Sequence, residues 1–384
     1  MLDNNRRGTA LVLTLWILAA LVVLAAGLGM MARTEAQISR NFGNLVRCRW
    51  AARAGENRAL VEIESLVTEP RTYLGEQGLA LSSEEEEIDL SDESYEVVVE
   101  DEAGKLNINS APRSALEALF DSREIADCII DWRDKDDTPR PLGAESQYYS
   151  SLRTPYSSKN GPFDTVGELL LVKDITKETL SIPATADGRP LSDLLTVYSW
   201  DKNVTVDGKE RVNIQTAAKE QLKAAFGEVL TDPDIDAIIK HRGTQEFKAA
   251  AEIALVPELP RDKVRRIYDR ITVSDKKTLP GRVNINTAPI EVLSVLPGMD
   301  TSMAESIVTR RSSEGAFDNV SDLMAVSGIT SEVFAKCADL LTVRSRVFKV
   351  ISTGRLARER SSRVVTCVVD VTEGASARIK YWQE

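Results

Sequence analysis

Acidic side chains are concentrated in one short stretch of the chain, DWRDKDDTPRPLGAE, which begins at Asp131. Four of them are close enough in sequence to act on one ion, and these are Asp134, Asp136, Asp137 and Glu145. Carboxylates in a flexible loop are hard oxygen donors, and calcium takes about six to eight such oxygens. The stretch therefore predicts a calcium site with these four residues as ligands, although their spacing is not that of an EF-hand. The other interpretation is a solvated acidic loop that Arg133 and Arg140 neutralise.

The other reactive side chains form no pattern for catalysis or for zinc binding. The chain of 384 residues has one histidine, His241, and four cysteines without a CxxC pair. No nucleophile stands next to a candidate base, so we expect no enzymatic activity. We expect each cysteine to be a single buried thiol, and the four are Cys48, Cys128, Cys337 and Cys367. A bond between Cys337 and Cys367 stays open, because an oxidising compartment would permit it.

A short pattern occurs three times, as KLNINSA from Lys105, RVNIQTA from Arg211 and RVNINTA from Arg282. Apolar residues at helical spacing follow each copy, with Pro112 and Pro289 expected in the first turn of two of the helices. The predicted N-caps are Ser110, Thr216 and Thr287. A second shared segment follows each helix, and its aromatic residue is predicted to anchor a small core: Phe163, Phe247 and Phe317. The pattern therefore predicts three related helical modules.

The third copy continues as LPGMDTSMAESI from Leu296, which resembles a helix-hairpin-helix. In hairpins that bind DNA, the turn offers backbone amides to a phosphate. Here Asp300 places a carboxylate in that position, where it would repel a phosphate and satisfy the amides internally. The net charge of -11 also fits a polyanion poorly. We therefore expect packing units and no nucleic-acid partner, while a membrane-anchored DNA receptor of the competence type remains the alternative, which salt-dependent binding to duplex DNA would favour.

The modules must be positioned by the rest of the chain, which begins with a long apolar segment. Residues 9–32 carry no charge, and about 20 such residues suffice to cross a bilayer. Arg6 and Arg7 precede this segment, which predicts a cytoplasmic N-terminus and an outward body. Periodic apolar positions continue beyond it, so we predict one helix from about Leu11 to Val67, with residues 33–70 as its amphipathic continuation. A plain signal anchor before any extracytoplasmic domain is the other interpretation.

Two further regions, residues 92–109 and 346–384, have the pattern of strands. Tyr95, Val97 and Val99 alternate with other residues in the first region, and a turn is expected near Ala103 and Gly104. The second region reads as three strands, with Gly354 and Gly374 near their ends. The stretches LSSEEEEIDLSDES and RLARERSSR are expected to be a solvated loop and a solvated turn. We predict one antiparallel sheet from residues 92–109 and 346–384, packed on the helix, with modules at residues 110–200, 201–275 and 276–345.

The N-terminal features together resemble those of a type IV pilin or pseudopilin: a short leader ending RRG, then an apolar helix that becomes amphipathic. The resemblance implies that a prepilin peptidase cuts between Gly8 and Thr9, so that residues 1–8 are a leader. Most family members have Phe or Met after the cut and Glu at the fifth mature position, where this chain has Leu13. That glutamate neutralises the N-terminal amine of a neighbouring subunit. Its absence is characteristic of the K-type minor pseudopilin at the tip of the type II secretion pseudopilus.

The acidic insert of the first module resembles the K-type subunits more specifically. The matching residues are Asp131, Trp132, Asp134, Asp136, Pro139, Gly143, Ala144, Glu145, Tyr149, Pro155, Tyr156, Lys159, Asn160, Gly161, Pro162, Phe163, Glu168, Leu169, Leu170, Leu171 and Val172. The resemblance covers the leader, the helix, this module and the closing strands. The central module looks like an additional repeat.

The resemblance implies an α+β fold: a pilin-like N-terminal long helix with a small antiparallel sheet, carrying a large, mostly α-helical insertion. It implies a single-pass inner-membrane subunit with a periplasmic body, which initiates or caps the pseudopilus and aids export across the outer membrane. Its partners would be other minor pseudopilins, bound through a helix face that includes Leu13, Ile38, Phe42 and Leu45, and also a secreted substrate or the outer-membrane channel. Calcium would be bound in the helical domain.

Overall fold

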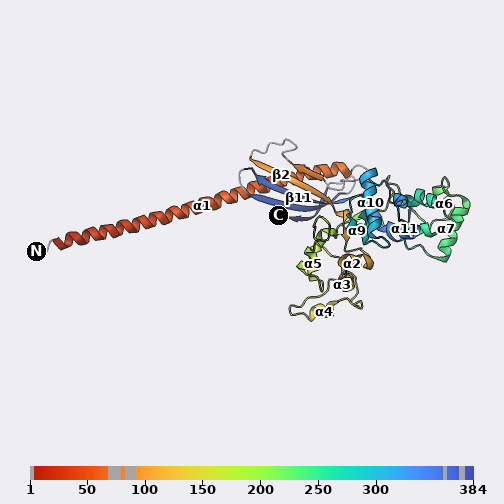
Figure 1. Cartoon of the computed structure of the whole chain (residues 1–384), viewed down its shortest axis with the longest axis horizontal. Helices are drawn as coiled ribbons and strands as arrows, with labels where there is room; N and C mark the ends of the chain where they lie inside the picture. Colours follow the sequence, from red (N-terminus) through yellow and green to blue (C-terminus); the bar gives the residue numbers. More distant parts are fainter. Residues whose placement is uncertain (1–3, 68–78, 83–91, 358–360, 372–376) are drawn as a thin grey trace.

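The computed structural model describes residues 4–67, 79–82, 92–357, 361–371 and 377–384. Helix α1 (Asn4–Val67) is one continuous helix of 64 residues, so the predicted long helix is confirmed. Its N-terminal part projects away from the rest of the chain as a stalk (Figure 1). Within α1, the span Thr9–Ser65 contains a window with a mean hydropathy of 2.7, so the helix is long and apolar enough to cross a membrane. From Asn44 onward, one face of α1 is buried against a sheet.

The sheet has the strand order β1-β2-β11-β12-β13, and all its neighbouring strands are antiparallel. The strands are β1 (Leu79–Ser82), β2 (Glu93–Asp101), β11 (Val347–Leu356), β12 (Ser362–Asp370) and β13 (Arg378–Gln383). Tyr95, Val97 and Val99 alternate with more exposed residues in β2 and pack in one core with Ala59 and Ile63 of α1. The predicted antiparallel sheet on the helix is therefore confirmed.

The sheet differs from the prediction in its edge and in its extent. Leu81 and Ser82 were expected to begin a solvated loop; instead they belong to strand β1, which pairs with β2 from Leu79 to Ser82. Strand β3 (Leu106–Asn107) was expected in this sheet but pairs elsewhere, because the 3-10 helix η1 (Glu102–Gly104) ends β2 and redirects the chain. Most of the acidic loop (residues 83–91), part of the basic turn (residues 358–360) and Gly374 lie outside the described residues.

Helix α1 and the sheet approach each other closely at two glycines. A Cβ at Gly354 would lie 2.5 Å from the backbone nitrogen of Ala52 and even nearer to the carbonyl oxygen of Cys48. A Cβ at Gly55 would lie 2.5 Å from Oγ of Ser352, which itself donates to the carbonyl of Ala52 at 2.6 Å. Gly354 was predicted near a strand end; the structure places it within β11, where the backbone of α1 leaves no room for a side chain.

The insertion between β2 and β11 consists of three modules of the same plan. Each begins and ends with a two-residue strand, and the two strands pair in parallel. The first module has β3, α2 (Arg113–Phe120), α3 (Arg123–Arg133), α4 (Ser146–Ser150), α5 (Lys177–Ser181) and β4 (Leu195–Thr196). The second has β6 (Val212–Asn213), α6 (Lys219–Phe226), α7 (Asp232–Thr244), α8 (Arg261–Ile267) and β7 (Ile271–Thr272). The third has β9 (Val283–Asn284), α9 (Ile290–Ser294), α10 (Thr301–Glu314), α11 (Ser331–Cys337) and β10 (Leu341–Thr342).

The repeated pattern in the sequence corresponds to repeated contacts. In each module one arginine of the second helix donates to two backbone carbonyls beside the first helix, and these arginines are Arg133, Arg242 and Arg311. The predicted aromatic anchors Phe163, Phe247 and Phe317 are all buried. Their backbone amides donate to the side chains of Asn109, Gln215 and Asn286, respectively. The three related modules are therefore confirmed, and their buried residues form one continuous core.

The predicted N-caps of the three opening helices were wrong. The helices are capped instead by Pro112, Ala218 and Pro289, none of which contributes a side-chain oxygen. The chain first makes a turn in which the amide two residues after Asn107, Asn213 or Asn284 donates to that asparagine's Oδ1. This turn places Ser110, Thr216 and Thr287 before the cap position.

Buried polar contacts fix the modules to the sheet. Asp101, at the end of β2, accepts hydrogen bonds from Asn284 (3.0 Å), Thr287 (2.5 Å) and Ser345 of the third module and its exit. Burial raises the pKa of this carboxyl above its usual range. Trp200, in strand β5 (Trp200–Lys202), donates to Asp370 of β12 at 3.2 Å. The insertion therefore holds a fixed orientation relative to the sheet and helix α1.

The four cysteines are buried free thiols, as predicted. Cys128 and Cys337 lie in the core of the modules, whereas Cys367 lies in the separate core of the sheet. The open possibility of a bond between Cys337 and Cys367 is therefore not realised in this structure.

Candidate functional site

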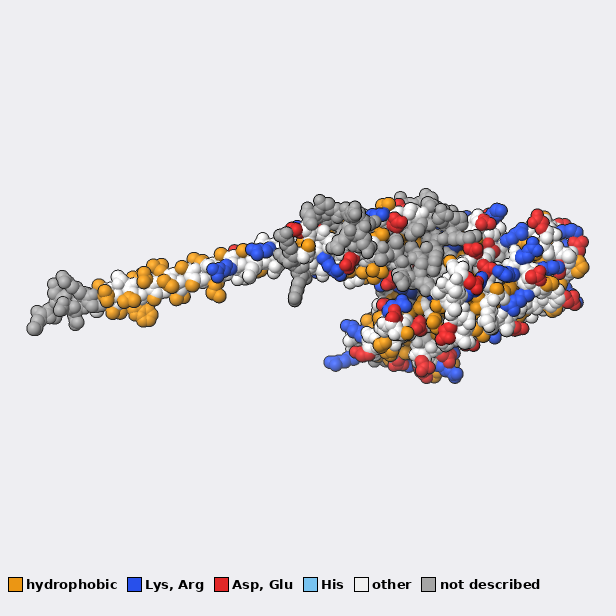
Figure 2. All heavy atoms as spheres, turned by 45° about the horizontal axis from the view of Figure 1, so that its top comes forward, with side chains coloured by type: hydrophobic (Ala, Val, Ile, Leu, Met, Phe, Trp, Pro, Cys, Tyr) orange, Lys and Arg blue, Asp and Glu red, His pale blue; other side chains and the backbone are white. Residues whose placement is uncertain are grey.

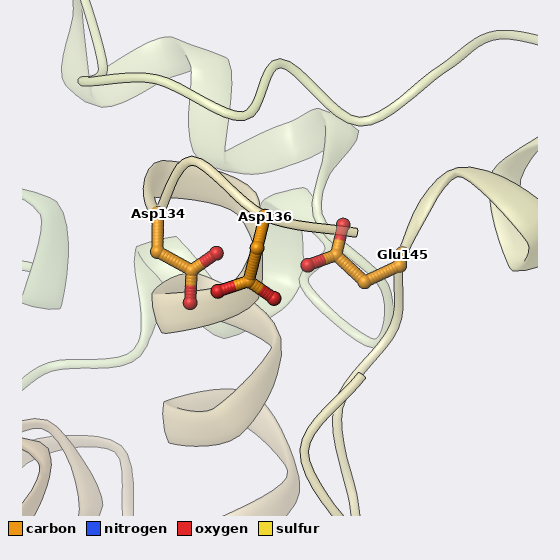
Figure 3. Close-up of side chains that lie close together, drawn as sticks. All are labelled: Asp134, Asp136 and Glu145. Atoms are coloured by element: carbon orange, nitrogen blue, oxygen red, sulfur yellow. The ribbon is translucent and has the colours of Figure 1, made fainter. Parts of the chain in front are cut away.

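The structure brings three of the four predicted calcium ligands together. One carboxylate oxygen each of Asp134, Asp136 and Glu145 lies within 4.8 Å of the other two. Figure 3 shows the three side chains pointing toward one another across the loop that follows α3. Asp134 follows the last residue of α3 as its C-cap, and Glu145 is the N-cap of α4, so two helix ends hold the outer members of the trio.

The fourth predicted ligand, Asp137, is not part of this trio. Its Oδ1 accepts a hydrogen bond from the backbone amide of Ser146 at 3.3 Å. The side chain of Ser146 and then this amide lower the pKa of the Asp137 carboxyl. Asp137 therefore ties the loop to the start of α4 instead of facing the other three carboxylates.

The two arginines proposed to neutralise the loop have different roles. Arg140 Nη1 donates to Asp131 at 2.7 Å and to Asp134 at 2.6 Å, so it neutralises part of the acidic charge. Arg133 instead donates to the carbonyls of Ile108 and Ala111 in the module core. Asp131 was not among the predicted ligands. Its side chain is fully buried, its pKa is raised by burial, and it holds Arg140 in place.

Several oxygens of the trio and its surroundings have no hydrogen-bond partner among the described residues. These are Oδ1 of Asp134, Oε1 of Glu145 and Oδ1 of Asn160, and all three are buried. Asn160 lies beside the trio, since its Nδ2 donates to the carbonyl of Asp136 at 2.8 Å. Burial, more than the neighbouring carboxylates, raises the pKa of Glu145 to about 7. Unpaired hard oxygens from three residues are the donor set that calcium prefers, so the residues present fit this ion.

Asn160 was missed as a candidate ligand, although it stands in the KNGPF run that marked the insert. Its backbone has a φ of 47°, in the left-handed region that asparagine tolerates better than most residues. That strained position holds its side chain beside the trio, and a carboxamide oxygen is an ordinary calcium ligand.

The predicted partner-binding residues lie along α1. Leu13, Ile38 and Phe42 are 64%, 63% and 69% exposed, and Leu45 is half-buried where the sheet begins to cover the helix. Figure 2 shows hydrophobic side chains along the stalk, with basic side chains nearer the body. The predicted cleavage position, Gly8 and Thr9, lies within α1, well outside the body.

The hairpin of the third module has the internal cap that its sequence predicts. Asp300 is the N-cap of α10, and its Oδ1 accepts from the backbone amide of Met303 at 2.8 Å. This hydrogen bond lowers the pKa of the Asp300 carboxyl, so it stays ionised at neutral pH. A phosphate approaching these amides would meet a negative charge that already occupies them.

A continuous apolar helix, an antiparallel sheet seated on it and inserted helix-hairpin-helix-like modules define the class: a membrane-anchored protein with a pilin-like part. The family described as type II secretion system protein K matches residues 104–182, which cover most of the first module and its acidic insert. The helix-hairpin-helix motif family matches residues 281–342, the third module. The K-type resemblance seen in the sequence is therefore confirmed for the first module, which matches the family of type II secretion system protein K.

Individual relatives match parts of the chain. The putative type II secretion system protein K of Escherichia coli K12 is 25% identical over 200 residues, which are 46% of this chain and 60% of the relative. ComE operon protein 1 of Bacillus subtilis is 40% identical over 62 residues, 16% of this chain and 30% of the relative. The human endonuclease/exonuclease/phosphatase family domain-containing protein 1 is 31% identical over 175 residues, 38% of this chain. The chain thus spans only 29% of the length of that human relative.

Among solved structures, the GspK-GspI-GspJ complex of the enterotoxigenic Escherichia coli type 2 secretion system aligns with 92% of this chain and 98% of the matched chain. The TM-score is 0.45 and the sequence identity is 13%.

Proposed function

We propose that this chain is a minor pseudopilin without enzymatic activity, at the tip of a type II secretion pseudopilus in the inner membrane. The observation that carries the proposal is the stalk: the apolar part of α1 is exposed along its whole length, with 0% of its most hydrophobic window buried. An exposed apolar helix of this length requires lipid or other apolar helices around it. The helices of other minor pseudopilins are the proposed partners.

The proposed position at the tip rests on Leu13 and on the shape of the body. Leu13 offers no carboxylate for the terminal amine of a subunit stacked above, so a further subunit would bury that charge without a partner. The second and third modules extend from the sheet in the direction away from the stalk, and the first module lies to one side of the body (Figure 1). Because buried polar contacts hold them in one orientation, they would cover the end of a fibre and initiate or cap it. The body would then face a secreted substrate or the outer-membrane channel.

Processing by prepilin peptidase tests this proposal directly. We expect the mature protein from its native membrane to begin at Thr9, as measured by mass spectrometry of the N-terminal peptide. Replacing Gly8 by leucine should leave the leader uncleaved, because the peptidase acts just after this glycine, while replacing Asn5 by alanine should not. The mature chain should co-purify with other minor pseudopilins from detergent-solubilised membranes. A mature start near Ala32, or retention on duplex DNA that weakens as salt rises, would favour a plain signal segment or a DNA receptor instead.

We also propose that Asp134, Asp136 and Glu145, together with Asn160, hold calcium and so brace the loop between α3 and α4. Saturation at about one hundred times the dissociation constant would stabilise the protein by about 2.7 kcal/mol, a rise in melting temperature of roughly 5 °C. Differential scanning fluorimetry in calcium against EGTA would measure this shift. Asp134→Asn and Glu145→Gln should abolish it. The matched variant Asp137→Asn should retain it, because Asp137 faces Ser146; loss of the shift in all three variants would contradict the assignment.

A further inference from the structure

The three modules end in equivalent threonines, and two of these bind a carboxylate from outside their own module. Thr196 in β4 donates to Glu102, which lies before the first module. Thr342 in β10 donates to Asp201 of β5 at 2.7 Å. A base accompanies each carboxylate: Lys105 contacts Glu102 at 2.6 Å, and Arg344 contacts Asp201 at 2.9 Å.

The equivalent position in the second module has no such partner. Thr272 in β7 accepts from the amide of Ser274, as its two counterparts accept from Tyr198 and Arg344. Its hydroxyl, however, donates only to the carbonyl of Ser274, at 3.3 Å. Among the residues that the structure describes, no carboxylate lies within hydrogen-bond distance of Thr272. The repeat therefore has two occupied carboxylate positions and a third that is open.

A cavity of about 580 Å³ lies at this third position, and Thr272 is part of its wall. The basic residues of the wall are Lys202, Arg211, Lys276 and Lys277, and the acidic ones are Glu210 and Asp275. Asn203 fixes the loop that carries Lys276 and Lys277, because its Nδ2 donates to the carbonyls of Ser274 (2.8 Å) and Lys276 (3.0 Å). Lys276 and Lys277 are exposed, and their ammonium groups make no ion pair within the described part of the chain.

We propose that this cavity binds an acidic side chain of an extended segment from a partner protein. Its carboxylate would accept a hydrogen bond from Thr272 and lie against Lys276 and Lys277. In the other two modules, Glu102 and Asp201 each contact a threonine and a basic residue in the same way. Both intramolecular occupants belong to peptide segments, and Trp200 gives the cavity an aromatic wall that suits a polypeptide. Nucleic acid is disfavoured, because Glu210 and Asp275 share the wall and the chain has a net charge of -11. This inference rests on the module repeat and does not depend on the proposed position at the pseudopilus tip.

The second module is well placed for such a contact. Its helices α6 and α7 lie at the end of the body farthest from the N-terminus of α1 (Figure 1). The cavity itself lies at the base of this module, beside the sheet, where Trp200 of its wall donates to Asp370 of β12. The proposed binding would give the second module, the additional repeat of this chain, a function beyond packing.

Binding of a short acidic peptide to the full chain in detergent tests the inference. The probe is a fluorescein-labelled peptide with the sequence VVEDEAGK, which is residues 98–105 and carries the natural occupant Glu102. Its control has the three acidic residues replaced by their amides. By fluorescence anisotropy we expect the acidic peptide to bind and the control peptide not to bind. The double reversal Lys276→Glu with Lys277→Glu should weaken binding about tenfold or more, because both charges lie at the bound carboxylate.

A matched charge reversal elsewhere in the same module separates binding at the cavity from a general effect of the net charge. Lys240 and Lys248 are exposed outside the cavity wall, so Lys240→Glu with Lys248→Glu changes the net charge equally and should alter affinity less than about twofold. Thr272→Val, of nearly equal shape, should weaken binding about threefold or more while leaving the melting temperature within a few degrees. Equal loss in both double reversals, no preference over the control peptide, or tighter binding of a duplex oligonucleotide would each overturn the proposal.

Discussion

Replacing Gly354 by alanine should loosen the sheet from α1 by about 2–3 kcal/mol, a large effect for a single methyl group. The new Cβ would lie inside van der Waals distance of two backbone atoms of α1, the carbonyl oxygen of Cys48 and the nitrogen of Ala52. Backbone atoms of a packed helix cannot rotate away as a side chain can. The helix must therefore move outward, and it would lose part of its contact with the core formed by Ile63, Val97 and Val350.

The cysteines supply a local measurement of this loosening. Cys48 lies on the buried face of α1 and Cys367 within the sheet core, while Cys128 and Cys337 lie in the modules. Thiol labelling followed by mass spectrometry would report local opening at each residue. In Gly354→Ala we expect Cys48 and Cys367 to react about 30- to 150-fold faster, the ratio that corresponds to about 2–3 kcal/mol. Cys128 and Cys337 should keep their rates.

Gly243→Ala is the matched control. Gly243 has open space around its missing Cβ and an ordinary backbone conformation, so this variant gains the same reduction in unfolded-state freedom without a clash. Its four thiols should react no faster than in the native protein. If Gly354→Ala labelled like Gly243→Ala, the close approach of helix and sheet would not be a determinant of stability.

Gly354 also illustrates what the sequence could not predict. The long helix, the strands of alternating burial and the three modules follow from local periodicity, which one segment carries by itself. A glycine within a strand indicates either a turn or a close approach, and only the position of α1 decides between them. Strand β1 was missed for a related reason: pairing with β2 makes it a strand, and four residues are too few for a local pattern to identify it.

The candidate calcium site could also be predicted only in part from the sequence. Composition identified the acidic loop, but Asp137 could not be separated from Asp134 and Asp136 by spacing alone. The separation comes from the start of α4, where the amide of Ser146 takes the Asp137 carboxylate. Asn160 reaches the loop from beyond α4, through a contact with the carbonyl of Asp136 that no local pattern encodes.

The second large effect is expected at Arg311, which connects the two helices of the third module. Its Nη1 donates to the carbonyls of Ile285 (2.7 Å) and Ala288 (2.8 Å), and the side chain is buried. Replacement by methionine keeps much of the volume but leaves both carbonyls buried without these donors. Each such loss costs about 1–3 kcal/mol, so we expect a total of about 2–4 kcal/mol. Cys337, in α11 of this module, should label at least about 30-fold faster, while Cys48 on the sheet side keeps its rate.

Two further methionine variants separate the loss of the two hydrogen bonds to carbonyls, which we call the carbonyl clamp, from the general loss of an arginine. Arg310, the preceding residue of α10, pairs with Glu314 at 3.0 Å and stacks on Phe317 at 4.4 Å. It donates to a single carbonyl, that of Asp322 at 3.1 Å, and part of its side chain lies in solvent. Arg310→Met should therefore cost less than about 1 kcal/mol. Arg242 clamps the equivalent carbonyls of Ile214 and Ala217 but is only half-buried, so water can replace its donors and Arg242→Met should fall between the two. A reversed order, with Arg310→Met the most damaging, would show that surface pairing and not the repeated carbonyl clamp holds the module together.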